Sequence, residues 1–266
     1  METVTTIPCT VEILTRNSGQ TLVPLLASLR DFAEIIVLDG GSTDDTKAVA
    51  ARFGCTVIDQ PPAFLEDGRI VDFAAVRNVG LAAAHQPWFL FVDSDEIVPP
   101  EFIQDIRERV NDSANPVSLY EVNRLYIIDG VLIEHSITYP AIQTRLFRRD
   151  AVAGFIKPVH ERIQARPEAQ IGRLTHALHV PQENAFFPKK WFHYLGIESK
   201  KYRSFSISKC LGITARRLAQ TGLYLLRYMR IVSLGKRPRA PWKCEASYIV
   251  YNVVHVFFMW KARLSP

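Results

Sequence analysis

Three acidic side chains, Asp93, Asp95 and Glu96, lie within four positions directly after the apolar run at 88–92. Carboxylates this close together repel each other, so their ionised forms need a cation or a cationic partner. Hard divalent cations such as Mg²⁺ or Mn²⁺ bind one or two carboxylates and take their other ligands from water and substrate phosphates. The spacing therefore predicts a divalent-cation site, although an acidic turn that caps the helix starting near Pro99 has the same composition.

A glycine-rich turn follows a second apolar run, at 34–39. Asp39 ends this run, Gly40 and Gly41 allow a backbone to approach a ligand closely, and Ser42 can cap the next helix. Turns of this kind also serve as ordinary connections between strands and helices. The turn therefore becomes a candidate binding site only together with other polar residues at the same edge.

Strand and helix patterns alternate along residues 1–160. The predicted strands are 10–15, 34–39, 55–59 and 88–93, and the predicted helices between them are 21–32, 42–54 and 72–85. This alternation predicts an α/β fold with a mostly parallel, Rossmann-like central sheet flanked by helices. Ligands of such sheets bind beyond the carboxyl ends of the strands. We therefore expect Thr15 and Asn17, which end the first strand, to lie beside Asp39 and the acidic turn.

The charge changes sign along the chain. Residues 1–188 carry 16 basic and 25 acidic side chains, whereas residues 189–266 carry 16 and 2. We predict a catalytic domain at 1–188 and a basic helical C-terminal region at 189–266. The second region mixes Lys and Arg with aromatic and aliphatic residues at helical spacing. This pattern is typical of helices that bind an anionic membrane surface, and also of helices that pack on a domain or on a second subunit. No standard nucleic-acid-binding motif occurs.

The cysteines and the longest apolar runs bear on location. Cys9, Cys55, Cys210 and Cys244 are far apart and form no C-x-x-C pair, which predicts neither a disulfide framework nor a zinc site and favours a reducing cytoplasm. No uncharged apolar run reaches the about 18 residues that span a bilayer, and the N-terminal residues lack the pattern of a secretory signal. The expected location is the cytoplasm, on the inner face of the plasma membrane.

Four segments, in this order and spacing, resemble the family-two glycosyltransferases with the GT-A fold: VLDGGSTDDT, AVRNVGLAAAHQPWFLFVDSDE, QTRLFRRD and KPVHE. The resemblance covers about residues 8–180 and is greatest to the non-processive group like the lipopolysaccharide core glucosyltransferases. It implies an inverting, metal-dependent transfer of a sugar from a nucleotide-sugar donor, with UDP as the expected nucleotide. The implied acceptor is a cell-surface glycan, such as a lipopolysaccharide or exopolysaccharide, or its lipid-linked precursor.

The resemblance also implies roles for individual residues. Asp39 would accept a hydrogen bond from the nucleotide base, Arg77 would lie against the base, and Asn78 would brace the loop. Gly40 stands where many relatives have a second Asp. The implied sets are nucleotide-binding Thr15, Asn17, Asp39, Ser42, Arg77, Asn78 and Asp93, donor-contacting Glu96 and Arg145, metal-binding Asp95, Asp93 and His179, and catalytic Glu161.

The predicted base is a carboxylate that takes the proton from the acceptor hydroxyl. Glu161 in VHE matches the family's position, although it could instead pair with Arg162 or Arg149 at the surface. In RLFRRD, side chains on an alternating strand point to opposite faces, so only one side of this cluster can contact a donor phosphate, and Arg145 is the expected residue. His179 is a candidate metal ligand, but a lone histidine is more often a packed or surface residue.

Two other hypotheses fit parts of the sequence. A strand ending in DSDEI also resembles the nucleophile motif of haloacid-dehalogenase phosphatases, with Asp93 and Asp95 as the reacting pair. That family places the motif on its first strand and needs a downstream Lys and acid pair, which are missing. A catalytically inactive scaffold of the transferase type is the other hypothesis. The residues that argue against it are Asp39, Arg77, Asp93, Asp95 and Glu161.

Overall fold

The computed structural model describes residues 6–186 and 189–264, and in these ranges strands alternate with helices as the sequence predicts. The strands are β1 (Ile7–Thr15), β2 (Phe32–Asp39), β3 (Thr56–Asp59), β4 (Leu65–Glu66), β5 (Arg69–Ile70), β6 (Trp88–Asp93), β7 (Leu119–Ile128), β8 (Val131–Leu132), β9 (Ile142–Arg148), β10 (Val152–Ile156), β11 (Arg162–Ala165), β12 (Ile171–Arg173) and β13 (Leu178–Pro181). The helices are α1 (Gly19–Ser28), α2 (Thr46–Arg52), η1 (Pro62–Phe64), α3 (Phe73–Ala83), α4 (Pro100–Asn111), η2 (Arg149–Ala151), α5 (Lys189–Tyr202), α6 (Ile207–Ser233) and α7 (Trp242–Leu264).

The chain forms two compact units. The first comprises Met1–Arg124 and Ala141–Pro181, and the second comprises Leu125–Pro140 and Gln182–Pro266. The charge pattern places a division between residues 188 and 189, and it gives no sign that Leu125–Pro140 belongs with the C-terminal helices. The functional division into 1–188 and 189–266 stays a prediction.

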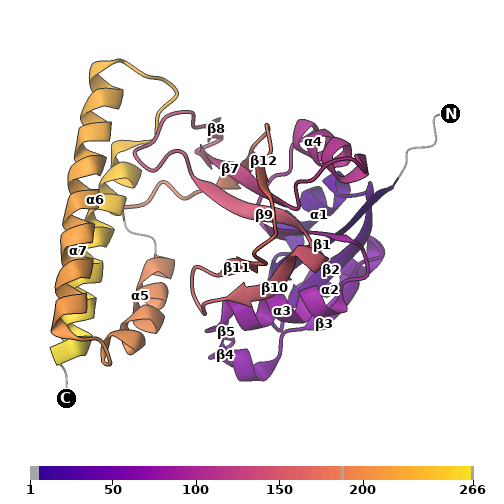
Figure 1. Cartoon of the computed structure of the whole chain (residues 1–266), viewed down its shortest axis with the longest axis horizontal. Helices are drawn as coiled ribbons and strands as arrows, with labels where there is room; N and C mark the ends of the chain where they lie inside the picture. Colours follow the sequence, from indigo (N-terminus) through magenta and orange to yellow (C-terminus); the bar gives the residue numbers. More distant parts are fainter. Residues whose placement is uncertain (1–5, 187–188, 265–266) are drawn as a thin grey trace. The chain divides into compact units, whose positions relative to one another are not determined.

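The central sheet confirms the predicted α/β class. Its strand order is β12-β7-β9-β6-β1-β2-β3, and β9 is antiparallel to both of its neighbours while the other pairs on this path are parallel (Figure 1). In the registers of β1 with β2 and β6, Thr15 lies opposite Asp39, and Leu14 lies opposite Asp93. The three strands therefore end at the same edge, and their polar ends come together there.

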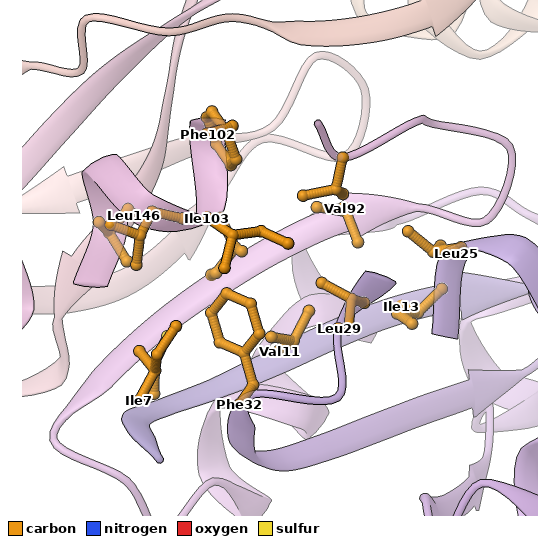
Figure 2. Packing of buried hydrophobic residues seen from close by; sticks show 14 of the residues in the cluster. Ile7, Val11, Ile13, Leu25, Leu29, Phe32, Val92, Phe102, Ile103 and Leu146 are labelled. Carbon is orange, nitrogen blue, oxygen red and sulfur yellow. The ribbon is translucent and has the colours of Figure 1, made fainter. Parts of the chain in front are cut away.

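One face of the sheet packs against α1, α2 and α4. Val11 and Ile13 of β1 contact this layer, which includes Leu25 of α1 and Phe102 of α4 (Figure 2). Fully burying each such side chain stabilises the fold by about 1.5–3 kcal/mol. The layer therefore fixes α1 and the loop that connects it to β1.

The other face of the sheet packs against α3 and β10. Four aromatic side chains gather there, and they are Phe89, Phe91, Phe147 and Phe155. Glu12 alternates with Val11 and Ile13 along β1, so it points to this face, where it is buried. A charged side chain in such a layer needs a partner, and α3 supplies it.

The second unit is built around three helices. The long helices α6 and α7 lie side by side and antiparallel, and α5 packs on α7 (Figure 1). Trp260 Nε1 of α7 donates to Thr214 Oγ1 of α6 at 3.0 Å, and the Tyr202 hydroxyl of α5 lies 2.8 Å from His255 Nε2 of α7. Across residues 6–186 and 189–264, helices that combine the length and the apolar character needed to cross a bilayer are absent.

Candidate functional site

Asp39 organises the turn that follows β2. Its carboxylate is buried and accepts hydrogen bonds from Ser42 Oγ (2.5 Å), from the backbone N–H groups of Gly41 (3.1 Å) and Ser42 (2.9 Å), and from Thr15 Oγ1 (3.2 Å). Burial opposes ionisation of this carboxyl, but the hydrogen bonds from Ser42 and the charge of Lys47 outweigh it and lower its pKa. These bonds hold residues 42–45 in the turn, so α2 begins at Thr46 rather than at Ser42.

Asn17 joins the loop after β1 to the loop after β2. Its backbone N–H donates to Ser42 Oγ at 2.8 Å, and its side-chain Oδ1 accepts from the Thr43 N–H at 2.8 Å. The structure therefore brings together Thr15, Asn17, Asp39 and Ser42, the four residues expected to line a nucleotide pocket at this edge. Because both oxygens of Asp39 already accept hydrogen bonds from its own turn, direct bonding to a base stays a prediction.

Arginines neutralise the acidic turn. Asp93 Oδ1 lies 2.8 Å from Arg77 Nη2, and Asp93 Oδ2 lies 3.3 Å from Arg145 Nη2. Glu96 Oε1 lies 3.1 Å from Arg145 Nη2 and 2.9 Å from Arg124 Nη2. The turn also closes on itself, because Asp93 N–H donates to Glu96 Oε2 at 2.9 Å. The cationic partners of Asp93 and Glu96 thus come from the chain itself.

The two carboxyls respond differently to these arginines. Burial raises the pKa of Asp93, but the charges of Arg145 and Arg77 outweigh it and hold that pKa well below its usual range. Glu96 is more deeply enclosed, and its burial raises its pKa even though Arg145 and Arg124 oppose the shift. Asp93 retains a side-chain exposure of 40% and therefore reaches the open edge of the sheet.

Arg77 is the centre of a buried ion-pair cluster. Its guanidinium lies 2.9 Å from Glu12 Oε1, 2.8 Å from Asp93 Oδ1 and 2.9 Å from Glu161 Oε1, and its side chain is only 2% exposed. It also packs over the Phe91 ring, 4.4 Å from the centroid. All three of these partners are carboxylates of the chain itself, and contact of Arg77 with a nucleotide base stays a prediction.

Glu161 reaches Arg77 from the loop between β10 and β11. Lys157 and His160 in this loop adopt positive φ angles of 75° and 54°, which turn the chain back towards α3. Glu161 Oε1 is held by Arg77 Nε, not by Arg162 or Arg149, and the side chain is 13% exposed. Among the residues that the structure describes, we find no hydrogen bond to its second oxygen, and its role as the base stays a prediction.

Helix α3 fixes this loop at a second point. Asn78 Nδ2 donates to the Phe155 carbonyl at 2.9 Å, and Asn78 Oδ1 accepts from the Phe155 N–H at 2.8 Å. The Phe73 N–H at the start of α3 donates to the Pro158 carbonyl at 2.8 Å. Asn78 therefore braces β10 and the segment that carries Glu161, next to Arg77 on the same helix.

The predicted metal ligands lie around the same turn. Asp95 is exposed at its tip, and the backbone of His179 pairs with that of Ile97 through bonds of 2.9 and 3.1 Å. Burial lowers the pKa of His179 and so favours the neutral imidazole, the form that binds metals. The described ranges contain no cluster of three or more His, Cys, Asp or Glu side chains that could hold a metal. This donor set fits a hard divalent cation that completes its shell with water and phosphate, and it does not fit a cation held by protein alone.

A pocket of about 220 Å³ opens beside the acidic turn, between α1 and the segment that follows β6. Its lining residues are Thr21, Pro24, Leu25, Ser28, Asp95, Glu96, Ile97, Val98 and Pro181. The tip of the acidic turn with Asp95 thus borders a space of the size of a small ligand group, whereas the Glu96 carboxylate is bonded to Arg124 and Arg145. The α1 side of this pocket was not expected from the sequence.

The family profile described as "Glycosyl transferase family 2" matches residues 10–193. The chain belongs to this family. The match confirms the family predicted from the four segments, and the sheet order confirms the predicted fold class. The haloacid-dehalogenase hypothesis is wrong, because the matched family is a different one. Asp93 lies on β6 and not on a first strand, and its carboxylate is held by arginines.

Curated relatives of this transferase align over part of its length. A TPR repeat-containing protein of Synechococcus elongatus is 32% identical to it, over 56% of this chain and 34% of the relative's length. The succinoglycan biosynthesis protein ExoO of Rhizobium meliloti is 26% identical, over 55% of this chain and 45% of the relative's length. An uncharacterised glycosyltransferase of Rickettsia felis is 27% identical over 35% and 31%. The chain thus spans about a third to a half of the length of these relatives.

Two solved structures are similar to parts of the transferase. Residues 1–349 of TarS from S. aureus, in complex with UDP, share 18% identity over 77% of this chain and 68% of that chain, with a TM-score of 0.45. Glucosyl-3-phosphoglycerate synthase from Mycobacterium tuberculosis, in complex with Mn²⁺, UDP-glucose and phosphoglyceric acid, shares 25% sequence identity. The alignment covers 44% of this chain and 43% of that chain, with a TM-score of 0.35.

Two charged residues of the transferase cluster were not predicted from the sequence. Glu12 is a single acid in a strand that is otherwise apolar, and burial raises its pKa to about 7 although Arg77 opposes the shift. A lone acid in the apolar segment TVEILT and an arginine in the middle of α3 could have indicated a buried ion pair between the strand and the helix. Arg124 on β7 gave no such signal, because its neighbours follow an ordinary strand pattern.

The arginines of β9 and η2 have separate environments in the transferase. Arg145 is buried, donates to the Phe91 carbonyl at 3.1 Å and lies over the Phe91 ring, so it holds the acidic turn from below. Arg148 is exposed and pairs with Asp150 at 2.9 Å. Arg149 belongs to η2 and not to the strand, so the alternation expected across these arginines ends at Arg148. Contact of Arg145 with a donor phosphate stays a prediction.

Proposed function

We propose that this glycosyltransferase is an inverting enzyme that uses a UDP-sugar and a divalent cation. The observation that carries the proposal is the position of Glu161 and Asp93 on one guanidinium, that of Arg77, at 2.9 and 2.8 Å. One carboxylate lies at the acidic turn where the donor is expected, and the other belongs to the acceptor-side segment. Arg77 therefore sets the spacing between a base and the donor site.

The proposed reaction is a single displacement. Glu161 Oε2 takes the proton from the acceptor hydroxyl, the hydroxyl oxygen forms the bond to the anomeric carbon, and the nucleoside diphosphate leaves with the electrons of the broken bond. Attack from the face opposite the leaving group inverts the anomeric configuration. Arg77 orients Glu161 through Nε, and Asn78 keeps the supporting loop in place.

Asp95 would hold the divalent cation, with His179 as the second candidate ligand. When bound, the cation neutralises the diphosphate leaving group. We assign Asp93 to the ribose side of the donor, since its oxygens accept from Arg77 and Arg145. Glu96 lines the pocket beside Asp95 and is assigned to the donor sugar.

We propose a glycan or a lipid-linked glycan precursor as the acceptor, met at the cytoplasmic face of the plasma membrane. One curated relative is named for succinoglycan biosynthesis, which supports a glycan acceptor. The net charge of +14 in residues 189–266 supports a site next to anionic lipid.

A screen of nucleotide sugars by thermal unfolding tests the donor and the cation together. A ligand that binds only the folded chain raises Tm, and we expect a UDP-sugar to do so more strongly with Mg²⁺ or Mn²⁺ than without. Asp95→Asn should remove the cation-dependent part of the shift. The matched control is Asp112→Asn, an exposed acid at the end of α4 that keeps an acceptor oxygen. If no nucleotide sugar raises Tm, or if Asp95→Asn leaves the cation effect intact, the proposal is wrong.

A further inference from the structure

Helix α6 carries a row of exposed apolar side chains. Their exposed fractions lie between 40% and 61%, and the row consists of Ile207, Leu211, Leu218, Leu225, Met229 and Val232. Leu223 and Leu226 are also exposed but lie outside this row. The steps between them are 4, 7, 7, 4 and 3 positions, which keep them on one side of a helix with 3.6 residues per turn. The row extends over nearly all 27 residues of α6. We call it the α6 apolar face.

The contacts of α6 with α7 lie directly beside this exposed row. Thr214 and Thr221, at helical steps of 3 or 4 from Leu218, and Arg217 bond to Trp260 and Asn252 of α7 at 3.0 to 3.3 Å. Cys210 lies on the side of these contacts and is fully buried. The apolar face is therefore left to solvent within the described part of the chain, although burying it would remove a large apolar area from water.

The surface around this face is positive. The only acids among residues 189–266 are Glu198 and Glu245, and both are buried, at 8% and 3% exposure. Glu245 accepts from the backbone N–H of Ile137 at 3.1 Å, and Glu198 lies 3.0 Å from Lys201 Nζ. The exposed basic residues described in this region are Lys201, Arg203, Lys209, Arg216, Arg230, Lys236, Arg237, Lys243 and Lys261. The described part of residues 189–264 thus has exposed positive charges and no exposed acid, and the exposed acids of the second unit, Asp129, Glu134 and Glu183, lie outside this range.

We propose that α6 lies in the plane of an anionic lipid surface, with its apolar face among the acyl chains and its basic residues at the headgroups. An amphipathic helix with one apolar side and one basic side, and without the overall apolar character of a spanning helix, binds membranes in this way. Anionic headgroups complement the charge, whereas the same face of a second copy would set another region of net charge +14, residues 189–266, against it. This inference concerns attachment and does not depend on the chemistry proposed for Glu161 and Asp95.

Flotation of the full chain with liposomes tests the proposal. We expect the chain to float with vesicles of phosphatidylcholine and phosphatidylglycerol and not with pure phosphatidylcholine. Leu218→Gln with Met229→Gln should abolish flotation. Arg216→Gln with Arg230→Gln should weaken binding about fivefold for each charge, because each basic residue near an anionic surface contributes about 1 kcal/mol. Raised salt should weaken the wild-type chain further.

The matched control is Val131→Gln with Ile171→Gln, two apolar side chains outside α6 with similar exposed fractions of 50% and 59%. It should float like the wild type. The proposal is overturned if the Leu218/Met229 variant floats as well as the wild type, or if the wild type does not float with anionic vesicles. Sedimentation that shows a wild-type dimer and a monomeric Leu218/Met229 variant also overturns it, since a second copy then covers the face. Donor-dependent Tm shifts measured on the same variants separate loss of attachment from loss of the sugar-binding site.

Discussion

At the scale of single residues, Arg77 determines the arrangement of the candidate site. A buried guanidinium requires carboxylate partners, and three of them surround it: Glu12, Asp93 and Glu161. Removing one partner of such a group leaves an uncompensated buried charge, so Arg77 and its carboxylates depend on one another. The residue expected to recognise a base connects the acidic turn to the predicted catalytic carboxylate.

We expect Glu161→Gln to reduce kcat about 100- to 10,000-fold, the usual contribution of a positioned general base. The amide has nearly the same shape and can still accept from Arg77 Nε, so donor binding, measured as the Tm shift with nucleotide sugar, should persist. Glu168→Gln is the control, because Glu168 is an exposed acid shortly after β11, the strand that follows the loop of Glu161. Unchanged turnover in Glu161→Gln would remove this residue from the mechanism. A chain without turnover in the wild type would favour the scaffold hypothesis.

At the scale of elements, α3 links the sheet to the loop that carries Glu161. It contributes Arg77 to the ion-pair cluster and Asn78 to the backbone of β10, and it packs close to β1 at Gly80. A Cβ at Gly80 would lie 2.1 Å from Glu12 Oε2 and 2.8 Å from Glu12 Cδ. The glycine therefore makes room for the buried carboxylate, and Glu12 cannot move aside without leaving Arg77.

Gly80→Ala should lower the free energy of unfolding by about 1–3 kcal/mol, the usual cost of overpacking a core. Gly222→Ala on α6 is the control with the opposite sign, because no atom lies within 4 Å of its added Cβ. Replacing a glycine in an open helix interior by alanine stabilises by about 0.8–1 kcal/mol. Urea unfolding of both variants measures the difference. Equal effects of the two substitutions would show that Glu12 does not fill the space beside α3.

At the scale of the whole molecule, each compact unit contains a buried acid with the same titration behaviour. Burial raises the pKa of Glu12 in the first unit and of Glu245 in the second, each to about 7. Since an unfolded glutamate titrates near 4.3, the folded chain binds more protons between these two values. The stability from the protonated forms is complete below pH 4.3 and is lost as the pH rises through 7.

Glu12→Gln and Glu245→Gln should each remove part of this pH dependence. From pH 5 to pH 8 the wild type should lose on the order of 1–3 kcal/mol of unfolding free energy that each variant keeps, because the amide does not lose a proton. Unfolding free energies at both pH values measure the change, and Glu168→Gln is the control at an exposed acid. If the difference in unfolding free energy between variant and wild type stayed constant with pH, the raised pKa values of Glu12 and Glu245 would be contradicted.

The sequence by itself determined the class of the molecule. Hydrophobic periodicity is a local property, so the alternation of strands and helices, and with it the common edge for Thr15, Asp39 and Asp93, followed from the pattern. The four motif segments and the charge change near residue 188 are also properties of the linear chain. They were sufficient to predict the family and a basic helical C-terminal region.

Only the tertiary structure decided which charges meet. The arginines around Asp93 and Glu96 come from α3, β7 and β9, and their distances depend on the antiparallel register of β9 between β6 and β7, which no local pattern encodes. The closure of the turn over Asp39 and the exposed side of α6 likewise depend on partners distant in sequence. Electrostatic pairing acts over a few ångströms in space, and the folded chain alone brings such groups within that range.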